Sequence, residues 1–208
     1  MQSIKSTYLF AIVIAAGVIG FVFYSLQGGP SPEDYTNEID RERKEKDLFM
    51  KNEKDSPFAG SGERFEGLRY FSPDLKYRIN AKLIPIEEKK VITLPTSDGQ
   101  EKRYLEYARA EFDLEGMANQ LVILEITDPG PYRGTLFLAF ADETSAGETY
   151  GAGRYLDLKK TPGATTMVLD FNKAYNPYCA YSNNFSCPFP PKDNVLKVSI
   201  NAGEKSYH

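Results

Sequence analysis

Residues 91–114 read VITLPTSDGQEKRYLEYARAEFDL and have the pattern of a β-hairpin. Two runs rich in β-branched and aromatic residues, VITLPT and RYLEYARAEFDL, lie on either side of the pair Asp98-Gly99. Glycine tolerates the positive φ that a tight hairpin turn needs, so this pair between two such runs is a strong turn signal. We therefore expect two antiparallel strands that are joined near Asp98.

Short apolar runs punctuated by glycine and proline continue to the carboxyl end of the chain. In KYRINAKL (76–83), apolar and polar residues alternate, which is typical of a half-buried strand. Parallel strands would need helical crossovers, and no convincing helix separates these runs. The sequence therefore predicts an all-β domain, an antiparallel β-sandwich or barrel of about eight or nine strands. The further runs are NQLVILEIT (119–127), GTLFLAFAD (134–142), GRYLDLK (153–159), TTMVLDF (165–171) and NVLKVSINAG (194–203).

Composition excludes several classes of function. The 208 residues carry a formal net charge of −4, and no block of lysine or arginine stands out, which argues against a nucleic-acid partner. The single histidine, His208, is the last residue, and a terminal residue is rarely held by packing. A Ser-His-Asp triad and a histidine-based zinc site are therefore not expected.

The amino-terminal segment predicts a membrane anchor. Residues 8–26 read YLFAIVIAAGVIGFVFYSL and contain no charge, and as a helix they would span about 28 Å. We expect residues 1–27 to form an uncleaved transmembrane signal anchor, with a cleaved signal peptide as the alternative. Lys5 precedes the segment and no lysine or arginine lies between Gln27 and Asp40, so the positive-inside rule places the amino terminus in the cytoplasm. The body would then be extracytoplasmic, in the bacterial periplasm or outside the cell.

A charged segment separates the expected anchor from the β-domain. GGPSP (28–32) predicts a flexible break, and residues 33–54 are dense in charge with only a narrow apolar stripe on a helix. We interpret residues 28–62 as a solvated helical stalk and linker, with a partner-binding coiled coil as the alternative. Residues 63–208 would form the β-domain.

Both cysteines lie in one loop. Cys179 and Cys187 are separated by AYSNNFS, and Asn183-Asn184 near the centre of that stretch suit a turn that brings the two cysteines together. On an oxidising membrane face the sequence predicts a disulfide, which would contribute roughly 2.5 kcal/mol. A redox-active or nucleophilic thiol is the alternative, although there is no CxxC motif and no usable histidine.

The carboxyl-terminal half carries a family resemblance. ADETSAGETYGAGRYLDL (141–158) and LDFNKAYNPYCAYSNNFSCPFPPKDNVLKVSINAGEK (169–205) resemble a prokaryotic family catalogued as domain of unknown function 1684. The resemblance extends upstream through SPFAGSGERFEGLRYFSPDLKYRINAKL (56–83), so it covers about residues 56–205. It implies a common fold and no particular activity.

The glycine-rich stretch GETYGAGRY is a candidate anion site. Gly151 and Gly153 permit close backbone approach, successive N–H groups can form an anion nest, and Arg154 would complete it. The alternative is a glycine-rich turn or bulge in which Arg154 pairs with an aspartate.

Carboxylates and amides near these loops offer two further kinds of chemistry. Asp142, Glu148 and Asp170 could act as general acid and base, or could bind calcium, unless they cap turns or pair with arginine. Asp170 and Asn172 would share one face of a strand, and nearby tyrosines offer flat surfaces on which a sugar or planar ligand could stack. The alternative is that the asparagines satisfy buried backbone groups. The full set of candidate ligand-binding residues is Gly151, Gly153, Arg154, Tyr155, Asp170, Asn172, Tyr175 and Asn176.

Three functions remain open from the sequence. The leading prediction is an anchored extracytoplasmic β-domain that binds a small polar or anionic ligand, or an envelope component. A carboxylate- or metal-dependent hydrolase and a structural or interaction protein of the cell envelope are the alternatives. No motif implies a cofactor; a flavin is not excluded, since flavin sites on β-barrels need no fingerprint.

Overall fold

The computed structural model describes residues 31–59 and 64–208. The chain divides into two compact units, Met1–Glu38 and Ile39–His208. The second unit contains the whole β-sheet together with the larger part of helix α2 (Pro32–Asn52). The functional argument below concerns this second unit alone.

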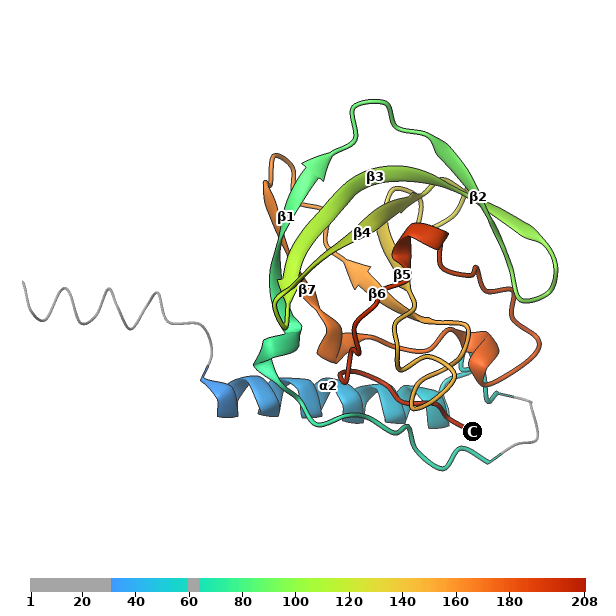
Figure 1. The fold of residues 1–208 in the computed structure, drawn as a ribbon. Coiled ribbons are helices and arrows are strands. Elements are labelled where there is room, and N and C mark those ends of the chain that lie inside the picture. Colours follow the sequence, from blue (N-terminus) through green and yellow to red (C-terminus); the bar gives the residue numbers. More distant parts are fainter. Residues whose placement is uncertain (1–30, 60–63) are drawn as a thin grey trace, which may run out of the picture. The chain divides into compact units, whose positions relative to one another are not determined.

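One antiparallel sheet curls into a half-barrel (Figure 1). Hydrogen-bonded neighbours follow the order β6-β5-β4-β3-β1-β7, and β2 pairs with the amino-terminal end of the long strand β3. The strands are β1 (Arg78–Pro85), β2 (Val91–Pro95), β3 (Glu101–Leu114), β4 (Met117–Ile126), β5 (Leu136–Phe140), β6 (Arg154–Leu158) and β7 (Thr166–Asp170). Short 3-10 helices interrupt the connections: η1 (Leu75–Tyr77), η2 (Phe171–Lys173), η3 (Tyr178–Ala180) and η4 (Lys192–Asn194).

The predicted hairpin is confirmed. β2 and β3 pair in register from Val91↔Leu105 to Pro95↔Glu101, and Gly99 sits in the turn with a φ of 79°. β3 then continues past the hairpin and pairs with β4 from Tyr104↔Ile126 to Leu114↔Met117. One strand thus connects the hairpin to the centre of the sheet.

Apolar side chains cover both faces of the sheet around β5. All five residues of LFLAF (136–140) are buried, a pattern expected when a strand is covered on both sides. Leu136, Leu138 and Phe140 belong to the core enclosed by the half-barrel. Phe137 and Ala139 belong to a second cluster on the outer face. That cluster also includes residues of the connection between η2 and η4, residues 174–191, which we call the cysteine loop. The outer face is therefore a second apolar layer rather than a solvated surface.

The predicted fold is wrong in its strand count, because NVLKVSINAG (194–203) is not a strand. Leu196, Val198, Ile200 and Ala202 alternate into the core as a strand would, yet the segment has no ladder partner beyond the single bridge Ala141↔Val195. Backbone hydrogen bonds join Asn194, Leu196 and Val198 to Ala141 and Glu143, and side chains satisfy backbone groups of Ile200 and Ala202 further along. The guanidinium of Arg154 donates to the carbonyls of Ile200 and Ala202, and to that of Glu204 just after the segment. The N–H of Ile200 donates to the carboxylate of Asp142. The alternation of apolar and polar residues predicts which side chains are buried. It does not predict which groups form hydrogen bonds with the backbone of the segment.

Asn194 takes over part of a strand's role at the start of this segment. Its amide accepts from the N–H of Val122 (2.7 Å) and donates to the carbonyls of Val122 (2.9 Å) and Ala139 (2.8 Å). It therefore bridges β4 and β5 beyond the two residue pairs by which those strands contact each other. A side chain thus closes a gap in the sheet.

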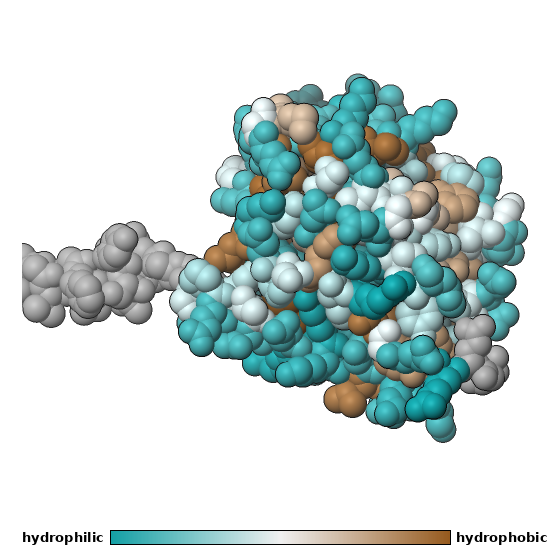
Figure 2. Space-filling model, turned by 60° about the horizontal axis from the view of Figure 1, so that its bottom comes forward, coloured by the Kyte–Doolittle hydropathy of each residue, from teal (hydrophilic) through white to brown (hydrophobic). Residues whose placement is uncertain are grey.

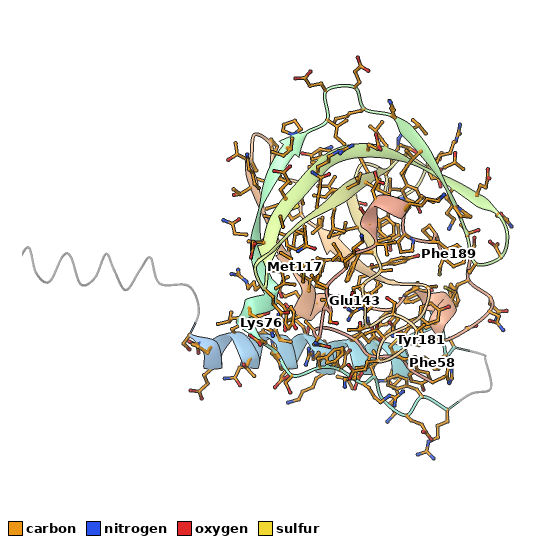
Figure 3. The ribbon with its side chains drawn as sticks, in the orientation of Figure 1. Phe58, Lys76, Met117, Glu143, Tyr181 and Phe189 are labelled. Carbon is orange, nitrogen blue, oxygen red and sulfur yellow. The ribbon has the colours of Figure 1, made fainter. Side chains whose placement is uncertain are left out.

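The predicted stalk is also corrected. Residues from Ile39 onward, including that part of α2, belong to the same compact unit as the sheet. Met50 and Phe58 are buried in a cluster with Tyr181, and Phe58 and Tyr181 lie side by side with ring centroids 5.6 Å apart (Figure 3). Ion pairs Lys46–Glu204 (3.0 Å) and Lys173–Glu42 (2.7 Å) add polar contacts between α2 and the carboxyl-terminal half. The charged helix is amphipathic, and at least two of its charged side chains, Glu42 and Lys46, form ion pairs with the carboxyl-terminal half.

The predicted transmembrane helix and single-pass membrane location are not supported. Within residues 31–59 and 64–208, no helix has the length and apolar character that a membrane crossing requires. The predicted span, residues 8–26, lies outside the described residues.

Gly153 offers a test of the packing around the start of β6. Its φ is 85°, and an added Cβ would lie 2.5 Å from the Phe140 carbonyl oxygen and 2.7 Å from Pro190 Cγ. Gly163 has a similar φ of 73° but open space around its Cβ position. Gly163→Ala should lower the free energy of unfolding by about 1 kcal/mol through backbone strain alone. Gly153→Ala should cost roughly 2 kcal/mol more because it adds the collision. Urea unfolding of both variants checks this, and equal losses would contradict the described packing.

Candidate functional site

A cleft of about 880 Å³ lies on the outer face of the sheet. Four parts of the second unit form it: the β4–β6 region, the start of β3, the cysteine loop, and the last turns of α2. Its size lies within the range of small-molecule sites in proteins, about 300–1,000 Å³. The side chains that line it include Lys46, Phe49, Met50, Lys102, Ile126, Tyr132, Phe137, Tyr155, Asp157, Tyr175, Tyr178, Phe185 and Cys187.

Seven aromatic side chains are among the residues that line the cleft. Tyr155 of β6 packs edge-on against Phe137 of β5 and against Tyr175, with centroids 4.7 and 5.9 Å apart. Tyr178 and Phe185 of the cysteine loop make a similar edge-on pair at 5.1 Å. These pairs are rigid because each ring has two torsions and is fixed by its neighbour.

Hydrogen bonds fix two of the cleft tyrosines. The hydroxyl of Tyr155 donates to the carbonyl of Pro188 (2.6 Å), and that of Tyr175 donates to Asp157 (2.8 Å). The backbones of Tyr155 and Tyr175 exchange hydrogen bonds at 2.8 and 3.0 Å, which ties the loop to the edge of β6. Burial raises the pKa of both phenols, and the neighbouring Asp157 raises that of Tyr175 further. Both remain neutral hydrogen-bonding groups at physiological pH.

Two lysines from distant parts of the chain face the cleft. Lys46 of α2 lies 4.6 Å from the centroid of the Tyr175 ring and pairs with Glu204 at 3.0 Å. Lys102 of β3 donates to the carbonyl of Ser186 at 2.8 Å. That carbonyl is neutral, so this contact leaves the positive charge of Lys102 uncompensated.

Glu204 is a buried carboxylate that the sequence did not reveal. Its side chain is 1% exposed and accepts hydrogen bonds from the Tyr181 hydroxyl, Lys46 Nζ (3.0 Å) and the backbone N–H of Asn176 (2.9 Å). Burial and this carboxylate raise the pKa of Tyr181. Glu204 therefore joins α2, the cysteine loop and the carboxyl-terminal segment at one point beside the cleft.

The predicted disulfide is absent. Cys179 and Cys187 are free, and the pair lies 3.3 Å apart without a bond. The β2–β3 turn holds the loop instead. Ser97 exchanges backbone and side-chain hydrogen bonds with Cys187 at 2.9 and 3.1 Å, and Asp98 accepts from the Ser186 hydroxyl at 2.8 Å. The loop is ordered because its polar groups are satisfied by the hairpin, so a crosslink is not needed.

The predicted anion nest at the glycine-rich stretch is occupied by the protein itself. Arg154 is 0% exposed, and its guanidinium pairs with Asp142 at 2.9 Å while donating to the carbonyls of Ile200, Ala202 and Glu204. Burial lowers the pKa of Arg154, and Asp142 opposes that shift. The alternative interpretation, in which Arg154 pairs with an aspartate, is the one observed. Gly151 and Gly153 belong to the turn that leads into β6 and do not line the cleft.

The predicted polar residues after β7 stabilise loops. Asp170 caps η2 by accepting from Asn172 N–H (3.2 Å), and its carboxylate lies 3.7 Å from Arg78. The Asn172 amide exchanges hydrogen bonds with the backbone of Asp74 at 2.9 and 2.8 Å, and the amide of Asn176 donates to the Lys205 carbonyl at 2.8 Å. These amides satisfy buried backbone groups, as the alternative interpretation proposed.

The candidate acid and base residues are each engaged by different partners. Asp142 is bound to Arg154 and Thr144, Asp170 caps η2, and Glu148 pairs with Lys205 on the surface at 3.4 Å. Within the described residues, no group of three or more histidine, cysteine or acidic residues is arranged to hold a metal ion. Of the eight candidate ligand-binding residues, Tyr155 and Tyr175 line the cleft.

Several cleft residues were missed. Phe137 carried a signal, since the fully apolar run LFLAF implies that both faces of β5 are covered. Lys46 and Lys102 carried none, because only the tertiary structure brings α2 and the hairpin to the same cleft.

Fold and site together define a class: a half-barrel β-domain with a ligand-sized aromatic cleft on its outer face. The chain belongs to the family described as protein of unknown function DUF1684, whose model matches residues 63–205. It is similar to the solution NMR structure of an uncharacterized protein from Haloarcula marismortui, with 38% sequence identity and a TM-score of 0.64. That match covers 85% of this chain and 97% of the archaeal chain. No curated protein matches this chain.

Removing the guanidinium of Arg154 should destabilise the domain. Arg154→Ala would leave Asp142 buried without its cation and several carbonyls without a donor, so we expect a loss of about 3–5 kcal/mol in the free energy of unfolding. The exposed Arg103 on β3 is a matched control, for which the alanine variant should stay within about 0.5 kcal/mol. Urea denaturation measures both. A stable Arg154→Ala protein would return Arg154 to the list of candidate ligand-binding residues.

The state of the cysteines can be read directly. In urea without reductant, a colorimetric thiol reagent should titrate two thiols per chain, because the cysteines are not bonded. The melting temperature of the native protein should not change when reductant is added. Thiols that appear only after reduction would contradict the described state of the loop.

Proposed function

We propose that the domain binds a small planar molecule that carries a negatively charged group, in the cleft on the outer face of β4–β6. The observation that carries the proposal is the combination of rigid aromatic walls with Lys102, whose ammonium contacts a neutral carbonyl at 2.8 Å. Binding sites for small molecules are mostly apolar with a few placed polar groups, and this cleft has that composition.

The aromatic walls favour a planar ligand. Tyr155, Phe137 and Tyr175 are held edge to face, so the cleft offers flat surfaces without the need to reorganise side chains on binding. Rings that are already ordered lose little conformational entropy when a ligand stacks on them. The neutral hydroxyls of Tyr155 and Tyr175 are bonded inside the protein, which leaves the ring faces as the main binding surface.

The charges favour an anionic group at one end. Lys102 and Lys46 both face the cleft, and Lys46 is already paired with Glu204. Lys102 is therefore the better partner for a ligand carboxylate, sulfonate or phosphate. Asp157 lies on β6 and would repel an anion there, so the two charges together define how the ligand is oriented.

The two other predicted functions have less support. A carboxylate-dependent hydrolase needs its acid and base close together, whereas Asp142, Glu148 and Asp170 are bound to separate partners. An interaction protein would usually present a broad apolar surface. On the face drawn in Figure 2, hydrophobic residues form small patches separated by hydrophilic ones.

A pair of fluorescent probes tests the proposal. The planar sulfonate 8-anilinonaphthalene-1-sulfonate should bind the native protein with one saturable site, and Lys102→Gln should weaken its affinity about tenfold, or about 1.4 kcal/mol. N-phenyl-1-naphthylamine, which lacks the sulfonate, should bind both proteins equally. The matched control Lys159→Gln removes an exposed lysine that does not line the cleft, and it should change neither affinity.

Two results would contradict the proposal. Equal weakening by both lysine variants would show that general charge, not the cleft, attracts the sulfonate. No saturable binding of either probe to a protein with intact near-ultraviolet circular dichroism would remove the cleft as a site for planar ligands.

A further inference from the structure

The two cysteines form a close pair whose members differ in exposure. Cys179 lies in η3 and is partly exposed, whereas Cys187 is 7% exposed and lines the cleft. They lie 3.3 Å apart, and the backbone N–H of Cys179 also donates to Cys187 Sγ at 3.2 Å. Two sulfur atoms this close share a proton, and the negative charge favours the member that water can reach.

The loop does not need these thiols for its order. Hydrogen bonds from Ser97 and Asp98 of the β2–β3 turn hold the segment around Cys187, and Pro188 accepts from Tyr155. Apart from the bond from Cys179 N–H to Cys187 Sγ, these contacts hold the loop without the thiols, which leaves the close pair free for chemistry.

We propose that Cys179 is a nucleophilic thiolate that takes up small carbon electrophiles, and that Cys187 is its positioning residue and hydrogen-bond donor. In the reaction, a lone pair of Cys179 Sγ forms the new S–C bond. With an alkyl halide the carbon–halogen bond breaks and halide leaves. With an activated alkene the C=C π bond breaks and the α-carbon takes a proton from water. Neither reaction requires an oxidant or a reductant.

The charges around the pair agree with this assignment. The hydrogen bond from Cys187 lowers the pKa of Cys179 to about 6, against the effect of burial, with Ser97 and the Tyr150 hydroxyl 3.8 Å away adding to the decrease. The same interaction raises the pKa of Cys187. Both directions of shift favour a single negative charge on the pair, carried by Cys179.

Tyr155, Tyr104 and Lys102 are the other titratable groups that interact with Cys187. Burial raises the pKa of Tyr155 of β6 and of Tyr104 of β3, so both phenols are neutral. Lys102 of β3 favours the charged form of Cys187 and opposes its raised pKa. No carboxylate contributes to the shift of Cys179. The inference does not depend on the proposed cleft ligand, because Cys179 does not line the cleft.

Alkylation kinetics test the proposal on the full chain. Iodoacetamide is uncharged, so its rate reports the thiolate rather than an electrostatic attraction; the modified residue is identified by peptide mass spectrometry. We expect Cys179 to react first, with a rate that rises through a midpoint near pH 6 and is level above pH 7. An ordinary thiol of pKa ~8.5 would still be rising at pH 8.

The size of the effect follows from two opposing factors. At pH 6 about half of Cys179 is thiolate, against roughly 0.3% of an ordinary thiol, a ratio of about 160. The lower basicity reduces the intrinsic nucleophilicity about 13-fold. The net expectation is a rate about tenfold above that of an ordinary thiol such as glutathione at pH 6.

Variants of Cys187 show whether Cys179 reacts because Cys187 lowers its pKa or only because Cys179 is exposed. Cys187→Ala removes the donor and should move the midpoint of Cys179 alkylation above pH 7.5, whereas Cys187→Ser keeps a hydroxyl donor and should hold it near 6 to 7. Urea unfolding of both variants verifies that they fold. A wild-type midpoint above pH 8, first reaction at Cys187, or equal midpoints in the alanine and serine variants would overturn the proposal. The wild-type profile alone decides if a variant fails to fold.

Discussion

The buried ion pair between Arg154 and Asp142 holds the carboxyl-terminal segment inside the half-barrel. Arg154 stands at the first position of β6, and its guanidinium reaches three carbonyls between Ile200 and Glu204. Asp142 accepts from the N–H of Ile200 and from Thr144. Beyond Val198 the segment fills the core without a strand partner, so it needs such donors and acceptors, since buried backbone groups left unpaired are costly.

The ion pair between Arg154 and Asp142 also positions Glu204 and its hydrogen-bond partners beside the cleft. The carbonyl of Glu204 is bound by Arg154, and its carboxylate is bound by Lys46, Tyr181 and the N–H of Asn176. Close packing at Gly203, where an added Cβ would meet the Ala174 carbonyl at 2.6 Å, keeps the segment against the loop after β7. The placement of Lys46 and Tyr175 in the cleft therefore depends on an arginine that does not line the cleft.

The second apolar layer explains why the outer face of the sheet can host a cleft. A half-barrel normally buries its concave side, and here the run LFLAF also presents Phe137 and Ala139 outward. The cysteine loop and the β2–β3 hairpin cover this face and are tied to each other through Ser97 and Asp98. Because they cover it incompletely, aromatic rings line an open volume of about 880 Å³ instead of a closed core.

Features that depend on neighbouring residues could be predicted from the sequence, whereas contacts between distant segments could not. The Asp98-Gly99 turn, the strands on either side of it and the tyrosines of the loop after β7 could be found in the sequence, because turn chemistry and period-two alternation act between neighbouring residues. The residues chosen as a binding site, Arg154, Asp170, Asn172 and Asn176, were the right residues to notice, but they satisfy the backbone of loops. The sequence does not distinguish a polar side chain that binds a ligand from one that binds a distant carbonyl, such as Arg154, which donates to Ala202 48 residues away.

The sequence by itself determined the hairpin, the antiparallel character of the strands, the burial alternation of residues 194–203 and the family. Tertiary structure alone decided that side chains would bond the backbone of this last segment at Ile200 and Ala202. It also decided that α2 would contribute Lys46 to the cleft and that the two cysteines would meet as free thiols. The reason is physical: alternation and turn propensity record how each residue relates to solvent and to its neighbours in the chain. Which donor meets which acceptor depends on where the folded sheet brings distant segments together.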